Sequence, residues 1–132
     1  MNLISGIDIT ASALTAEKLR ADIIAQNIAN AHTTRDVDGA PYQRKLVNFE
    51  TVLQQAGKGV RVAQVVNDTR PGPVVYDPAH PDADENGMVQ MPNVNLAMEM
   101  IDLMAASRAY EANLAVIRNA RQMAAKALSI GR

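Results

Sequence analysis

Apolar residues recur along the last part of the chain in alternating steps of four and three positions. This series covers residues 96–128, and only Ser107 and Arg121 interrupt it with polar side chains. A matching series covers residues 4–28, with Lys18 as its one charged member. Alternating steps of three and four give the period of about 3.5 residues that lets helices pack along a continuous seam. The pattern therefore predicts a long amphipathic helix at each end of the chain.

The bounds of these two helices follow from their flanking residues. The first is predicted over residues 3–31, because the turn signal at residues 38–41 follows it. The second is predicted over residues 96–130, with Asn95 as its N-cap and Gly131 as its stop. At 1.5 Å per residue this helix is roughly 50 Å long. The rest of the chain is too short to cover it, so we expect another molecule to do so.

The segment between the helices is rich in Pro, Gly and acidic residues. Two short strands are predicted in it, at residues 60–66 and 74–76. Residues 42–53 fit a helical turn or a weakly alternating strand, and both readings stay open. A turn is predicted at residues 57–59 and an extended loop at residues 77–95. The expected fold is mainly α, with a small irregular or β middle segment.

Composition excludes several classes of partner. Of the 132 residues 48% are hydrophobic but only 3% are aromatic, which suits thin helix–helix seams better than a thick core. The net charge of −1 lacks the basic field that nucleic-acid binding needs. No apolar run approaches the ~20 residues of a membrane span, so we expect no direct membrane insertion. The N-terminus has no basic region and its apolar residues are interrupted by Asp8, Thr10 and Glu17, so no cleaved signal peptide is expected.

Candidate catalytic and metal-binding residues are weak. Residues 82–87 match the opening of a calcium loop, but Asn93 stands where a bidentate Glu is needed, so a solvated acidic turn is favoured. His32 and His80 are the only histidines, and there is no cysteine, which argues against a zinc site. No nucleophile motif surrounds any serine. We therefore expect no catalytic residue, no metal, no cofactor and no enzyme activity.

Three stretches together resemble a known family. Residues 25–35 (AQNIANAHTTR) resemble the N-terminal signature of bacterial flagellar rod and hook proteins. Residues 76–94 resemble the loop typical of the proximal-rod FlgC type, and residues 100–113 (MIDLMAASRAYEAN) resemble the C-terminal rod and hook signature. Met88 and Ser107 depart mildly from the family pattern. The three stretches occur in the expected order with fitting intervals.

The resemblance implies a structural subunit of the flagellar basal-body rod in the periplasmic space. It implies that the terminal helices, in segments 1–35 and 96–132, pair antiparallel as a coiled-coil-like tube domain, with the middle segment 36–95 between them in the chain. It also implies export by the flagellar type III apparatus without a cleaved signal. The implied partners are other rod proteins and the inner-membrane ring or rod adaptor, in a helical tube of like and related subunits.

The candidate assembly interface combines the two apolar series with two amides of the N-terminal signature. We expect the N-terminal residues of the seam to pack against the C-terminal ones, and alanine-rich faces to contact adjacent subunits, with Ser107 and Arg121 as points of register. The candidate residues are Ile7, Leu14, Ala21, Asn27, Ile28, Asn30, Leu103, Tyr110, Leu114 and Ile117. Isolated monomers are expected to be poorly ordered at both termini. A helical adaptor or chaperone of an export system is the main alternative, and a calcium-binding module a distant third.

Overall fold

The computed structural model describes residues 3–54 and 57–130. The two helices hold 27 and 35 residues, which confirms the expected mainly α fold with a small β middle segment. In chain order the elements are α1 (Leu3–Ala29), β1 (Lys45–Gln54), β2 (Gly57–Asn67), β3 (Val74–Tyr76), β4 (Met88–Gln90) and α2 (Leu96–Ile130).

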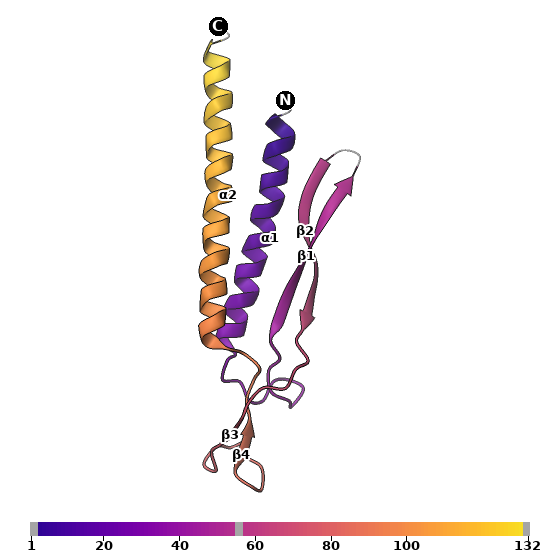
Figure 1. Ribbon diagram of the computed structural model, residues 1–132, viewed down its shortest axis with the longest axis vertical. Coiled ribbons are helices and arrows are strands. Elements are labelled where there is room, and N and C mark those ends of the chain that lie inside the picture. The colour runs from indigo at the N-terminus through magenta and orange to yellow at the C-terminus, as the bar shows by residue number, and fades with distance from the viewer. Residues whose placement is uncertain (1–2, 55–56, 131–132) are drawn as a thin grey trace.

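The helices lie side by side and antiparallel, and α2 extends well past the beginning of α1 (Figure 1). At 1.5 Å per residue α2 is about 52 Å long and α1 about 40 Å. The predicted N-cap is confirmed, because the Asn95 side-chain oxygen accepts a hydrogen bond from the Met98 backbone N–H at 3.2 Å. Both long helices predicted from the apolar spacing are therefore present, while the predicted stop at Gly131 lies outside the described residues.

The face that α2 turns toward the rest of the chain differs in part from the predicted series. Glu99 and Ala106 are its buried residues, whereas Met100 and Ser107, each one position later, are exposed. Farther along, Tyr110 does keep a half-buried place, as the series predicted. The apolar series places the seam one residue too late because it skipped a position occupied by a charged side chain. The prediction was therefore wrong at Met100 and Ser107, whereas Leu103 between them is half-buried as predicted.

The middle segment resolves the ambiguity at residues 42–53 in favour of a strand. β1 pairs antiparallel with β2 in a two-stranded ribbon, with a register shift between Asn48 and Phe49. The strand predicted at residues 60–66 is confirmed within β2, but residues 57–59, predicted as a turn, are part of that strand. The connection at residues 55–56 lies outside the described residues.

The ribbon packs against the face of α1 opposite α2, so α1 lies between them (Figure 1). The Ser12 hydroxyl accepts a hydrogen bond from the Val60 backbone N–H at 3.1 Å. A Cβ on Gly59 would lie 2.9 Å from that hydroxyl oxygen, so a side chain at this position would displace the Ser12 hydroxyl from its bond to β2. Because α1 is covered on two sides, it holds more buried residues than α2.

The strand predicted at residues 74–76 is confirmed as β3, but its partner β4 was not predicted. The loop expected over residues 77–95 instead turns back at Gly87, whose φ of 76° favours glycine. One oxygen of the Asp84 carboxylate accepts hydrogen bonds from the Asn86 and Met88 backbone N–H groups, each at 2.8 Å. This turn closes a three-residue pairing of β3 with β4.

Gly72 should be intolerant of substitution because the chain preceding α2 passes directly over it. A Cβ at this position would lie 2.1 Å from the Met91 carbonyl oxygen and 2.6 Å from the Pro92 carbonyl carbon. We expect Gly72→Ala to lower the free energy of unfolding by roughly 2 kcal/mol or more, measured by urea denaturation followed by circular dichroism. In the control Gly6→Ala, a Cβ on α1 meets nothing within 4 Å, and the gain should be about 0.5–1 kcal/mol. Equal unfolding midpoints for Gly72→Ala and the unmodified chain would contradict the close approach.

Candidate functional site

Two buried polar side chains lie where the helices meet the middle segment. Glu99 in the first turn of α2 is 0% exposed and Asn27 near the end of α1 is 1% exposed. The Asn27 side-chain N–H₂ donates to a Glu99 carboxylate oxygen at 3.0 Å, which joins the two helices directly. Buried polar groups cost free energy unless they are hydrogen-bonded, so their remaining partners decide whether this arrangement is stable.

Asn27 uses all of its hydrogen-bonding capacity. Its N–H₂ group also donates to the Lys45 carbonyl oxygen at 2.9 Å. Its side-chain oxygen accepts from the Lys45 backbone N–H at 2.9 Å and from the Tyr42 hydroxyl at 3.0 Å. An amide side chain offers two donors and two acceptor positions, so none is left unsatisfied. This one residue thereby connects α1 to α2 and to the first residue of β1.

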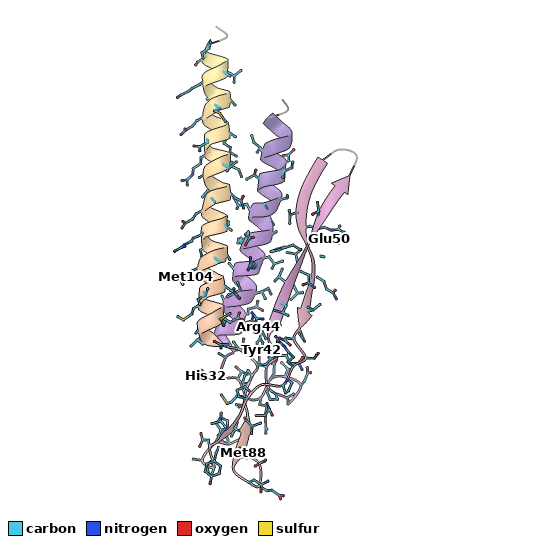
Figure 2. The ribbon with its side chains drawn as sticks, viewed as in Figure 1. His32, Tyr42, Arg44, Glu50, Met88 and Met104 are labelled. Carbon is cyan, nitrogen blue, oxygen red and sulfur yellow. The ribbon has the colours of Figure 1, made fainter. Side chains whose placement is uncertain are left out.

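Glu99 takes its second partner from the segment before β1. The Arg44 Nε donates to the other Glu99 carboxylate oxygen at 2.5 Å, and the Arg44 guanidinium lies 3.5 Å from Asp102 one turn later. An acidic residue in the first turn of a helix is also favoured by the helix dipole. We call Asn27, Tyr42, Arg44 and Glu99 the polar junction; Figure 2 shows Tyr42 and Arg44 at the lower ends of the helices.

A second layer of hydrogen bonds attaches the end of β2 and the approach to α2. The Asn93 side-chain oxygen accepts from the Arg44 backbone N–H at 2.8 Å, and its N–H₂ group donates to the carbonyl oxygens of Asp68 and Arg70, each at 2.8 Å. Hydrogen bonds from Arg70 lower the pKa of the Asp68 carboxyl to about 2. Every segment that enters or leaves the helix pair is thus bonded to the junction or to its second layer.

Sequence reasoning missed the polar junction. Of its four residues only Asn27 was among the candidate interface residues, and Glu99 lies outside the predicted apolar series. One feature of the sequence could have indicated the burial of Glu99. It is a charged residue next to the predicted apolar series of the last helix. The partners of Glu99 lie 55 and 72 positions away along the chain, at Arg44 and Asn27, and no local pattern points to them.

The candidate interface residues are distributed along the helix pair. Asn27 belongs to the polar junction, while the Asn30 N–H₂ group donates to the Gln26 carbonyl oxygen at 2.9 Å. Ala21 and Tyr110 line one hollow between the helices, so the structure brings these two together across the pair. The remaining candidates are half-buried: Ile7, Leu14, Ile28, Leu103, Leu114 and Ile117. Their contacts with other subunits stay a prediction.

The Asp82 carboxylate of the acidic loop is bonded to the segment that follows α1. One Asp82 oxygen accepts from the Thr34 hydroxyl at 2.7 Å and the other lies 2.7 Å from the Arg35 guanidinium. The His80 Nδ1 accepts from the Asp82 backbone N–H at 3.0 Å. Within residues 3–54 and 57–130 no cluster of three or more histidines or acidic residues could hold a metal. The Asp82 carboxylate therefore binds the segment after α1, whereas the Asp84 carboxylate closes the turn before β4.

A large apolar surface remains exposed on α2. Met104, labelled in Figure 2, lies on its outer side and is 56% exposed. No helix of the described chain has the length and apolarity needed to cross a membrane. Exposed apolar surface of this extent on a folded subunit marks a protein-binding face. The exposed large apolar residues of α2 are Leu96, Met98, Met100, Ile101, Met104, Val116, Met123, Leu128 and Ile130.

Comparisons with known families match both helices. The family model described as "Flagella basal body rod protein" matches residues 7–35, and "Flagellar basal body rod FlgEFG protein C-terminal" matches residues 85–130. The helix pair therefore places the chain among the structural proteins of the flagellar basal-body rod.

Full-length relatives define the family further. Flagellar basal-body rod protein FlgC of Borreliella burgdorferi is 42% identical over 149 residues, covering 98% of each chain. That of Salmonella typhimurium is 42% identical over 133 residues, covering 99% of each chain. The Bacillus subtilis protein is 39% identical over 150 residues, covering 100% of each. This chain belongs to the FlgC family of flagellar basal-body rod proteins. It is a structural protein and not an enzyme, and the comparisons do not support an export adaptor or chaperone.

Removing Glu99 should destabilise the subunit far more than removing an exposed carboxylate. Glu99→Ala leaves the Arg44 guanidinium and the Asn27 amide without their buried partner, which costs about 3–5 kcal/mol. The matched control is Glu50→Ala on β1, whose ion pair with Arg61 is exposed and contributes about 0–1 kcal/mol. Urea denaturation of both variants measures the difference.

Glu99→Gln guards against a variant too unstable to measure, since it keeps an oxygen that can accept from Arg44. We expect Glu99→Gln to lower the free energy of unfolding by an amount between the losses caused by Glu99→Ala and Glu50→Ala. If all three variants unfold at the same urea concentration, the junction does not stabilise the fold.

Proposed function

We propose that this chain is a subunit of the proximal rod, in which its two helices form part of an inner tube and other subunits cover the outer face of α2. Membership of the FlgC family supports the location in the basal body. The observation that carries the proposal is the row of exposed apolar side chains along α2, because a subunit that stayed single would leave this surface in water. In a tube, neighbouring copies and related rod proteins would cover this apolar surface and exclude water from it.

The proposed work of the subunit is mechanical, passing torque from the inner-membrane ring toward the distal rod and hook. Contacts that join unlike faces of neighbouring subunits do not close and so propagate as a helix. Stiffness then depends on how firmly α1 and α2 are held together within each subunit. Support comes from one side of α2, where the buried positions 99 and 106 and the half-buried positions 103, 110, 114 and 117 follow one another at about the helical period of 3.6 residues and so form a continuous contact face.

We also propose that segments 1–35 and 96–132 act as the tube domain and that segment 36–95 forms an arm on it. The candidate interface residues, which are all buried or half-buried, would then hold α1 to α2, whereas a second group, the exposed apolar residues of the outer face of α2, would meet neighbours. The partners would be other rod proteins and the inner-membrane ring or rod adaptor. The polar junction supports a fixed angle between arm and tube, because its partners come from both.

Export to the periplasmic side without a cleaved signal is part of the same proposal. Residues 3–29 form α1, and α1 contacts both α2 and β2. Removal of a leader from this segment would delete one half of the helix pair. A subunit that keeps its first helix in the assembled rod therefore fits export by the flagellar type III apparatus.

A pair of neighbouring charge insertions tests the division between the two groups of residues. Leu114→Asp places a charge between α1 and α2, and we expect a loss of about 2–3 kcal/mol in unfolding free energy together with loss of swimming. Val116→Asp places the same charge on the outer face, where Val116 is 53% exposed. We expect this variant to keep the stability of the unmodified chain and still to block swimming.

The measurements are urea denaturation of the purified chains and spreading in soft agar of a strain that carries only the variant. Basal bodies isolated from the same strains report whether the chain is incorporated. Normal swimming with Val116→Asp would contradict a covered outer face. Absence of the unmodified chain from isolated basal bodies would contradict the rod function itself.

A further inference from the structure

The last turns of α2 form a basic helix end without cover from its own chain. We call residues 118–130 the α2 tip, which lies at the end of the helix that extends past α1 (Figure 1). After Glu111 the sequence of α2 holds no acidic residue, whereas Arg118, Arg121 and Lys126 are all exposed. None of these three cations forms an ion pair within the described part of the chain.

The α2 tip also carries apolar side chains that lack cover. Leu128 is 77% exposed and Ile130 is 84% exposed, the highest values among the large apolar residues of α2. The α2 tip is narrow because it contains the small side chains of Ala124, Ala125 and Ala127, and it can therefore approach another helix closely. A narrow helix end that is both basic and apolar fits a hollow that offers apolar walls and acidic edges.

The chain itself contains a hollow of that kind. An open space of about 310 Å³ lies between α1 and α2, against Ala21, Ala106 and Tyr110. Ala106 is 0% exposed, so the bottom of the hollow is formed by small side chains and the tyrosine ring instead of long polar ones. Such a surface can accept another narrow helix at short range.

The edges of this hollow are acidic. Glu17, Asp22 and Glu111 line it together with a single cation, Lys18. One Glu17 carboxylate oxygen is buried without a hydrogen-bond partner in the described part of the chain, and the Arg20 guanidinium lies 3.8 Å from it. The hollow therefore carries two more negative than positive side chains, while the α2 tip carries only positive ones.

We propose that the α2 tip of one copy docks into the hollow of a second copy of this chain, with Arg118 and Arg121 against Glu17 and Glu111. The inference rests on the proposed rod function and names one contact that would build it. Arg118 and Arg121 are three positions apart and so lie on one side of the helix, whereas Lys126, five positions after Arg121, lies about 140° around the helix from Arg121. Tip and hollow are different surfaces of the same chain, so each docked copy still presents a free hollow or a free tip, and the contact propagates.

Because the chain contains no cysteine, site-specific cross-linking tests this contact without background from other residues of the same chain. Cells express two differently tagged full-length copies, one with Glu111→Cys and the other with Arg121→Cys. Isolated basal bodies are then treated with a short bismaleimide. The docked arrangement predicts an adduct that carries both tags. Arg118→Cys, on the same side of the tip, provides a second pair should Arg121→Cys disturb assembly.

Lys126→Cys paired with Glu111→Cys is the matched control, and here loss of the doubly tagged adduct is expected. Equal adduct yields for Arg121→Cys and Lys126→Cys would overturn the proposed orientation. An adduct with a different rod protein, without the doubly tagged product, would overturn a second copy as the occupant. If both copies are present in basal bodies and no adduct forms, the docking is wrong while the rod function stands. If neither copy enters basal bodies even unmodified, the rod function fails.

Discussion

The burial of the Glu99 carboxylate is the constraint on which the arrangement of this subunit depends. A carboxylate without access to water is stable only when cations and hydrogen-bond donors surround it, and no neighbour on α2 can supply both. Its partners are Asn27 from α1 and Arg44 from the segment before β1. The helices cannot bury their shared end unless the middle segment is folded against it. Arm and helix pair are therefore expected to form as one cooperative unit.

The opposite end of the helix pair is held far less firmly. The ribbon of β1 and β2 packs on α1 and not on α2, so α2 has one covered side and a long outer side in water (Figure 1). The difference in length between the helices leaves the last turns of the α2 tip without α1 beside them. A subunit that is anchored at one end and incomplete at the other suits a protein whose missing contacts come from assembly. This agrees with its membership of a rod family.

The helices could be predicted from the sequence because few structures except paired long helices keep a period of 3.5 residues over so many turns. The family followed from motifs that lie on and beside them. The strand β4 was not predicted because a segment of three residues is too short to show a periodic pattern. The strand β1 stayed ambiguous because the preference of a segment for strand structure depends on what packs against it. The burial of Glu99 was not predicted because it depends on partners 55 and 72 positions away along the chain. Local patterns thus predicted the elements, whereas the polar junction that joins them is a property of the tertiary structure.

Amide hydrogen exchange along α2 in the free full-length chain tests most directly whether the subunit is anchored at one end and incomplete at the other. Exchange reports local opening, which should be rare where buried contacts are many and frequent where they are few. We predict slow exchange near Glu99 and Ala106, progressively faster exchange toward Ile130, and protection of the α2 tip only in isolated basal bodies. Uniform protection of α2 to its last turns in the free chain would show that the helix needs no cover from other subunits, which contradicts a subunit completed by assembly.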